Sequence, residues 1–243
     1  MKFHLRREEK YMRRLSDSYA MITARNALSP VTESFRALCT NLQFIQGDSG
    51  VWTPHVIAVT SAYPGEGKTI TAVNLAVAYA QEGKRVLLIE GDIRKQSFMG
   101  IFGHEGGSGL VQAIHADEAP ADAAYASAIE NLFVIPAGYM PGIPSADLFA
   151  SKRFEGFVQM AREQYDIVIM DTPPVLVVND AKQIALRCDG VLLVAQSGRT
   201  RRKWLQQAQF QLERVNANLL GTVLNRYKGR QEAGLQAYSG MKR

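Results

Sequence analysis

The sequence predicts an α/β fold with a mostly parallel, doubly wound sheet flanked by helices. Two observations predict this fold class. Short apolar runs rich in Val, Ile and Leu recur along the chain with helical segments between them, which is typical of a parallel sheet covered on both faces. In addition, one such run, 56–60, leads directly into a glycine-containing segment and then into a helical pattern. That order is the context of a phosphate-binding loop.

The elements follow from periodicity and from breaking residues. Phe35, Leu38 and Leu42 recur at helical spacing and predict a helix over 30–44, capped by Ser29 or Thr32. Further helices are expected over 69–81, about 145–164 and 203–215. Continuous apolar runs predict strands at 56–60, 85–89, 132–136, 166–170, 190–194 and 219–224. The segment 97–130 is expected to contain loops and helix.

Length and composition indicate how many domains the chain forms and where they begin and end. With 243 residues, 47% of them apolar, the chain can build one sizeable α/β domain. We expect a basic N-terminal extension over 1–28, a nucleotide domain over 29–228 and a flexible basic tail over 229–243. The net charge of +5 gathers near both ends. These ends are either simply solvated or attracted to anionic lipid or an acidic partner; no specific nucleic-acid motif is recognised.

Targeting and redox signals favour the cytoplasm. No run of about 18 apolar residues predicts a membrane span, and the charged start lacks the apolar stretch of a signal peptide. Cys39 and Cys188 are the only cysteines. Two distant cysteines make neither a disulfide framework nor a zinc site, so we expect ordinary core or partly buried thiols.

The strongest motif is the segment Ala62-Tyr63-Pro64-Gly65-Glu66-Gly67-Lys68-Thr69. Gly65 and Gly67 allow the backbone to curl so that its amides point at phosphate oxygens, and the following helix adds the positive end of its dipole. Lys68 can reach the β- and γ-phosphates, and the Thr69 hydroxyl can ligate Mg²⁺. The sequence therefore predicts a P-loop NTPase that uses ATP and Mg²⁺.

Two strands end in acids. The run 86–89 leads into Glu90 and Asp92, and the run 167–170 leads into Asp171. Because ligands bind beyond the carboxyl ends of parallel strands, these acids are candidates for Mg²⁺ and for a catalytic base. The alternative is that they cap the helices that follow. Arg94 is a candidate catalytic residue or the partner of an ordinary salt bridge.

Together these segments resemble the bacterial tyrosine kinases. The phosphate loop, the stretch Glu90-Gly91-Asp92-Ile93-Arg94-Lys95 and the stretch 165–174 look like the Walker A, A′ and B motifs of that family. The similarity extends through 179–181, 189–194 and 220–225, and upstream through 29–38. Related partition and division-site ATPases usually carry a second lysine early in the loop, where this chain has Ala62.

The resemblance implies an autophosphorylating ATP:protein-tyrosine phosphotransferase acting in capsule or exopolysaccharide synthesis. Nucleotide contacts would come from the loop and the start of its helix, and Asn225 would lie near the adenine. The loop residues implied are Gly65, Glu66, Gly67, Lys68, Thr69 and Ile70. Because the chain shows no membrane span, it resembles the group whose kinase is a separate cytoplasmic chain, recruited to the inner face of the plasma membrane and activated by the cytoplasmic tail of a membrane adaptor.

The sequence departs from the family pattern at three places. Glu90 stands where aspartate is usual. The oligomerisation helix keeps Glu33 and Arg36 but has Cys39 in place of the second arginine, which puts a family-type homo-oligomer in doubt. The tail tyrosine cluster is reduced to Tyr238, with Tyr227 near the last strand, as phosphoacceptor candidates. Two alternatives stay open: a degenerate kinase that regulates the membrane export machinery through ATP binding, and a positioning ATPase.

Overall fold

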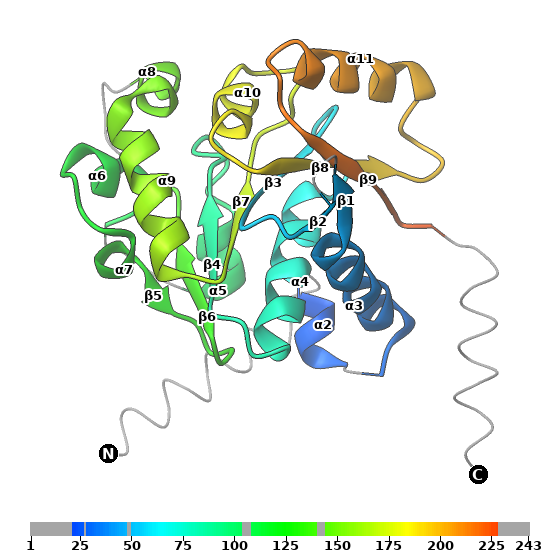
Figure 1. Cartoon of the computed structure of the whole chain (residues 1–243), viewed down its shortest axis with the longest axis horizontal. Coiled ribbons are helices and arrows are strands. Elements are labelled where there is room, and N and C mark those ends of the chain that lie inside the picture. Colours follow the sequence, from blue (N-terminus) through cyan, green and yellow to red (C-terminus); the bar gives the residue numbers. More distant parts are fainter. Residues whose placement is uncertain (1–20, 27, 48–49, 104–107, 140–143, 228–243) are drawn as a thin grey trace.

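The computed structural model describes residues 21–26, 28–47, 50–103, 108–139 and 144–227. Its centre is a seven-stranded sheet with the order β5-β6-β4-β7-β3-β8-β9 (Figure 1). All neighbours are parallel except β5 and β6. The strands are β3 (Val56–Ser61), β4 (Val86–Glu90), β5 (Tyr125–Ala126), β6 (Leu132–Ile135), β7 (Ile167–Asp171), β8 (Gly190–Gln196) and β9 (Leu219–Asn225). The predicted fold class is confirmed.

Helices cover both faces of the sheet, because the central strands are apolar on both sides. In β3, Ile57 and Val59 pack into one core and Val56 and Ala58 into two others on the opposite face. The first face carries α2 (Ile22–Arg25), α3 (Pro30–Gln43), α4 (Lys68–Gln81) and α5 (Phe98–Phe102). The second carries α6 (Leu110–His115), α7 (Pro120–Ala123), α8 (Ser145–Ala150), α9 (Lys152–Gln164), α10 (Asp180–Ala185) and α11 (Arg202–Glu213).

Local structure differs from the prediction in several places. The helix expected over about 145–164 is two helices, because Ser151 adopts an extended conformation with ψ 153° and its hydroxyl accepts from the amide of Phe154. A small antiparallel hairpin, β1 (Ile45–Gly47) and β2 (Gly50–Trp52), follows α3. The short helix α10 was not expected either. Ser29 rather than Thr32 caps α3, since its hydroxyl accepts from the amide of Thr32.

The ordered core begins upstream of the expected boundary at residue 29. Met21 is buried, and the amide of Thr23 donates to Asn74 Oδ1 on α4 at 2.9 Å. Residues 21–26 therefore pack with the domain rather than with a separate extension. The rest of the expected extension, 1–20, and the expected tail, 229–243, lie outside the described residues.

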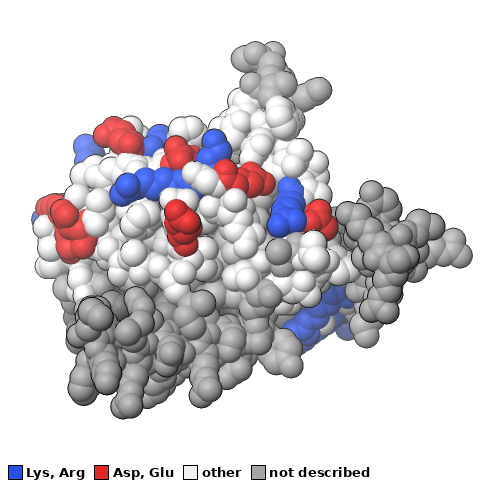
Figure 2. Space-filling view, turned by 90° about the horizontal axis from the view of Figure 1, so that it is seen from below, with Lys and Arg blue, Asp and Glu red and all other residues white. Residues whose placement is uncertain are grey.

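Helix length, the cysteines and the surface charge can be compared with the sequence-based expectations. Within the described ranges, no helix is both long and apolar enough to cross a bilayer. Cys39 and Cys188 are free thiols, one buried and one partly buried, as predicted. Figure 2 shows a face on which acidic and basic side chains are interspersed rather than gathered by sign. Much of the basic excess near the two ends lies outside the described residues.

Candidate nucleotide and phosphotransfer site

The loop after β3 has the backbone that phosphate binding requires. Gly65 and Gly67 adopt φ values of +85° and +103°, a region that disfavours residues with a Cβ. Gly67 caps α4, so the helix begins at Lys68 and its first amides face the loop. Since α4 is buried along most of its length, this arrangement of amides is held rigidly.

Two residues brace the loop from outside it. The Asn225 side chain, at the end of β9, donates to the carbonyl of Glu66 at 3.1 Å, and a Cβ on Gly67 would lie 1.8 Å from Asn225 Nδ2. The Glu66 carboxylate is buried, accepts from the amide of Tyr63 at 3.0 Å and pairs with the Thr200 hydroxyl. Asn225 is thus brought to the phosphate loop. Thr200 was not predicted, and nothing in its sequence context marks it.

Two of the three strand-end acids meet at the loop lysine. β4 and β7 are neighbours in a register that sets Glu90 opposite Asp171. Lys68 Nζ lies 2.8 Å from Asp92 Oδ2 and 3.6 Å from Asp171 Oδ1. The Thr69 hydroxyl donates to Asp171 Oδ2 at 2.7 Å. The structure therefore brings together four of the predicted residues: Lys68, Thr69, Asp92 and Asp171.

Burial sets the electrostatics of this cluster. Burial alone lowers the pKa of Lys68, but the charges of Asp171 and Asp92 outweigh it and raise the pKa above its usual value, so the ammonium stays charged. Complete burial raises the pKa of Asp171, against the opposing effects of Lys68 and Thr69. The charged ammonium group of Lys68 is thus shared by two carboxylates. An incoming phosphate can compete with these carboxylates for it.

The donor set fits a magnesium ion bound together with a nucleotide. Asp171 Oδ1 is buried and has no hydrogen-bond partner among the described residues, and an orphaned carboxylate oxygen suits a cation or its water shell. Among the same residues no group of three or more His, Cys, Asp or Glu side chains could by itself hold a metal. Thr69, Asp92 and Asp171 would therefore share the ion with phosphate oxygens and water, as is usual for Mg²⁺.

Glu90 is oriented differently from the other acids. It is fully buried, its Oε1 accepts from the amide of Phe98 at 2.9 Å, and its Oε2 accepts from the amide of Ala137 at 3.1 Å. Burial raises the pKa of Glu90 to about 7, although these two amides act in the opposite direction. Its carboxylate thus binds backbone rather than Lys68, in contrast to the metal or base position considered from the sequence.

Arg94 lies at the rim of the site. Its guanidinium donates to Ser145 Oγ at 3.1 Å and lies 3.7 Å from Asp180 Oδ2, while 61% of its side chain is exposed. Asp180 itself is buried at the start of α10. The contact with Asp180 matches the salt-bridge alternative, and the exposure leaves the guanidinium open to a ligand.

The remaining candidates lie apart from this cluster. Glu33 and Arg36 form an ion pair on the surface of α3. Tyr227 is exposed just beyond β9, and Tyr238 lies outside the described residues. These positions neither support nor oppose the oligomer-contact and phosphoacceptor assignments, which stay predictions.

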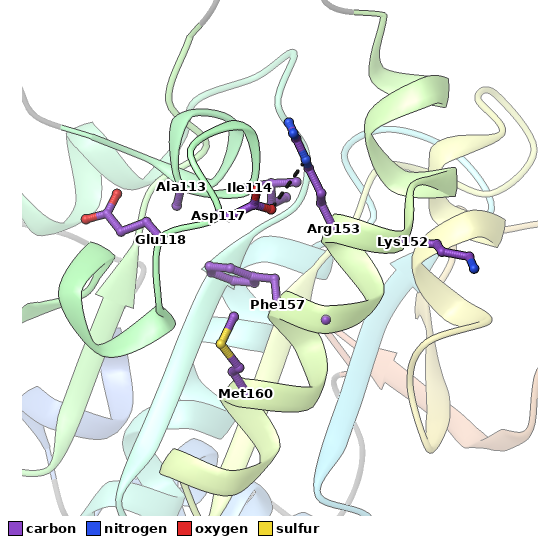
Figure 3. A pocket seen from close by; sticks show the side chains of 9 residues that line it. Ala113, Ile114, Asp117, Glu118, Lys152, Arg153, Phe157 and Met160 are labelled. Atoms are coloured by element: carbon purple, nitrogen blue, oxygen red, sulfur yellow. Dashed lines mark ion pairs between the residues drawn. The ribbon is translucent and has the colours of Figure 1, made fainter.

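Two hollows open on the surface. One, of about 440 Å³, is lined in part by Ile93 and Arg94, which follow Asp92 in the chain. The other, of about 260 Å³, lies between α6 and α9, with Phe157 and Met160 below an ion pair of 3.4 Å between Arg153 and Asp117 (Figure 3). The lining of neither hollow includes a phosphate-loop residue or a strand-end acid.

Comparison with known proteins agrees with this geometry. A family model described as an AAA domain matches residues 54–220. The chain is 38% identical over 195 residues to a protein named tyrosine-protein kinase CpsD from Streptococcus pneumoniae serotype 4, covering 80% of this chain and 83% of the relative. This protein belongs to the bacterial tyrosine kinase family. The family resemblance seen in the motifs is therefore confirmed.

Solved structures extend the comparison to three dimensions. The chimerical protein CapA2B2 superposes with a TM-score of 0.79 at 34% identity, covering 88% of this chain and 92% of that chain. The septum site-determining protein MinD from Pyrococcus horikoshii, complexed with Mg-ADP, gives a TM-score of 0.60 at 22% identity, covering 75% of this chain and 76% of that chain. The second likeness shows a shared fold only.

Proposed function

We propose that this protein is an ATP-dependent protein-tyrosine kinase that transfers the γ-phosphoryl group of ATP to a tyrosine hydroxyl. The observation that carries the proposal is the contact of Lys68 with both Asp92 and Asp171 beside the phosphate loop. Membership of the tyrosine kinase family supports the choice of acceptor.

The chain's own residues suggest how the transfer proceeds. The loop amides and Lys68 bind the β- and γ-phosphates, which draws the ammonium group away from Asp171. Asp92, released from Lys68, can accept the proton of the tyrosine hydroxyl. At the same time the tyrosine oxygen forms a bond to the γ-phosphorus. The bond to the β–γ bridging oxygen breaks in line, and ADP leaves. Thr69, Asp171 and Asp92 would hold magnesium, which neutralises charge on the phosphate oxygens.

We further propose a role in capsule or exopolysaccharide synthesis at the inner face of the plasma membrane. The family resemblance supports this setting and suggests a membrane adaptor as partner, whose cytoplasmic tail activates the kinase. The name of the chimerical relative, CapA2B2, fits a two-component arrangement. A homo-oligomer through α3 is part of the proposal, with Glu33 and Arg36 as its contacts.

One observation favours a second candidate, an ATP-binding regulatory module without phosphotransfer. Glu90, at a position where the family usually has aspartate, binds two backbone amides instead of facing Lys68. If that position is essential for the chemistry, this chain would bind nucleotide and signal through it without forming phosphotyrosine. The positioning ATPase is less well supported, because Ala62 replaces the second loop lysine.

A labelling experiment separates these candidates. The full chain is incubated with radiolabelled ATP, magnesium and a fusion of an adaptor tail, and phosphotyrosine is identified by mass spectrometry. The kinase proposal predicts labelled tyrosine that is lost in Lys68→Met, by on the order of 10²–10³-fold. Lys84→Met, at an exposed lysine just after α4, is the matched control. Nucleotide binding without any phosphotyrosine would favour the regulatory module.

A further inference from the structure

The cleft that Ile93 and Arg94 line in part has two walls. One wall is the segment after β4, which contributes Ile93, Arg94 and Gln96, and the other is the segment after β6, which contributes Gly138 and Tyr139; the rest of the lining comes from Val111, Pro144 and Ser145. Its volume of about 440 Å³ lies within the range of small-ligand pockets, roughly 300–1,000 Å³. The first wall begins at Ile93, the residue after Asp92, and this adjacency in the chain links the cleft to the proposed phosphotransfer site.

The Glu90 carboxylate joins the bases of both walls. One oxygen accepts from the amide of Phe98, at the end of the first wall, and the other accepts from the amide of Ala137, in the second. Glu90 is completely buried, so both hydrogen bonds are shielded from water. The amides of Phe98 and Ala137 are therefore both tied to one carboxyl group.

The two walls differ in their other supports. The second wall is fixed by α6, since the amides of Leu110 and Val111 donate to the carbonyls of Pro136 and Ala137, at 2.8 and 3.1 Å. In the first wall Gln96 adopts a φ of +48°, which is costly for a residue with a Cβ. Among the described residues, Gln96 also links the two walls, since its Nε2 donates to the carbonyl of Gly138 at 3.3 Å.

We propose that Glu90 is a positioning residue, which holds the two walls of this cleft together and so shapes the surface that receives the acceptor tyrosine. This inference rests on the proposed kinase function. It assigns Glu90 a different task from metal binding or proton abstraction, because both of its oxygens are engaged with backbone amides. Asp92 and Asp171, which face Lys68, are left for those two tasks.

The substitution Glu90→Asp separates the two roles. Aspartate keeps the charge and matches the residue usual in the family, but it is one methylene shorter and cannot span both amides. A positioning role predicts that the KM for a synthetic Glu-Tyr copolymer rises on the order of tenfold. The kcat at saturating copolymer and the affinity for Mg·ATP should then change by less than about twofold. Glu163→Asp, on the exposed side of α9, is the matched control.

The opposite pattern would overturn the proposal. If Glu90 binds metal or abstracts the proton, Glu90→Asp should retain the copolymer KM, and Glu90→Gln should lose kcat and Mg·ATP affinity instead. Gln96→Ala, which removes the other bond between the walls, is expected to raise the copolymer KM in the same direction by a smaller factor. This variant keeps the test usable should the Glu90 variants fail to fold.

Hydrogen exchange tests the inference without any kinase activity. In full-length Glu90→Asp, the amides of Phe98 and Ala137 should exchange faster than in the wild type, while those of α4 stay unchanged. Unchanged exchange at both amides would contradict the positioning role even in an active kinase. Conversely, faster exchange in Glu90→Asp, together with a wild-type chain that forms no phosphotyrosine, would support the positioning role and reject the kinase function.

Discussion

The two ends of the central sheet hold their carboxylates in opposite ways. At the amino end, Asp189 accepts from the amides of His55 and Val56, both at 2.8 Å, and from Arg162 Nη1 at 2.7 Å. At the carboxyl end, Asp171 is fully buried, has one oxygen without a hydrogen-bond partner among the described residues, and shares Lys68 with Asp92.

The pKa directions express the same difference. Burial works against the charge of Asp189, but Arg162 and the two amides outweigh it and hold the pKa of Asp189 below its usual value. Burial prevails at Asp171 and raises its pKa. At the amino end, the Asp189 carboxylate is thus paired within the protein and stabilises the fold. At the carboxyl end, Asp171 keeps an oxygen that a bound ligand or its metal ion can pair with. Changes at the two ends should therefore separate activity from stability.

Asp171→Asn should have the largest effect on activity. It removes a proposed magnesium-binding oxygen and the charge opposite Lys68, so phosphotransfer is expected to fall by on the order of 10²–10³-fold. The melting temperature of the ligand-free protein should not fall, because burial raises the pKa of Asp171 and so disfavours its charge in the folded state, and Lys68 keeps Asp92 as its partner. Phosphotyrosine assays and thermal scans of the same preparation measure both quantities. A large loss of stability with activity retained would reverse the contrast between the two ends.

Gly67→Ala should damage the phosphate loop itself. The new Cβ would occupy the place of Asn225 Nδ2 at a φ of +103°, which costs about 1–3 kcal/mol in backbone strain and displaces Asn225 from Glu66. ATP affinity should fall with stability, as measured by calorimetry and urea unfolding. Gly83→Ala is the matched control, because its φ is +83° but nothing lies within 4 Å of its Cβ. It should lose stability without loss of ATP affinity.

Asp189→Asn tests the amino end. Loss of the charge-assisted bond to Arg162 should lower the free energy of unfolding by about 1–2 kcal/mol, with kcat unchanged. Urea unfolding and phosphotyrosine assays measure the two effects. A fall in kcat at full stability would show that the two ends are not independent.

The dependence of stability on acid pH tests the same interaction of Asp189 with Arg162. Since folding lowers the pKa of Asp189 below its ordinary value of 3.8, its contribution to stability is present above about pH 4 and is lost as the pH falls through the lower folded value. In Asp189→Asn this part of the acid dependence should disappear. If the variant loses as much unfolding free energy at acid pH as the wild type does, other carboxylates cause that loss.

Gly156→Ala should have the smallest effect and belongs to neither end. Gly156 is exposed inside α9, and a Cβ there meets nothing within 4 Å. Alanine should stabilise the protein by about 0.5–1 kcal/mol, because glycine loses more backbone freedom in a helix. The midpoint of urea unfolding measures this gain, which should leave ATP affinity unchanged. Destabilisation would mean that the hollow beside α9 needs the glycine.

The sequence predicted the carboxyl end well in outline, because motif spacing and strand ends place Lys68, Thr69, Asp92 and Asp171 by simple topology. It could not foresee that Glu90 binds the amides of Phe98 and Ala137, since those residues are 8 and 47 positions away and carry no side-chain signal. The break at Ser151 was missed for a similar reason: a single serine cap interrupts a continuous helical pattern. Long-range backbone contacts of this kind are set by packing, which periodicity does not encode.

Calorimetric titration of the full-length protein with ATP tests the central account most directly. Titrations with magnesium and with EDTA should show saturable binding that magnesium strengthens. In the account, the phosphates bind the Lys68 ammonium group in place of Asp92 and Asp171, and the two carboxylates then hold magnesium. In Lys68→Met this binding should weaken markedly. Absence of ATP binding in magnesium buffer by a folded wild-type chain would contradict the account at its base.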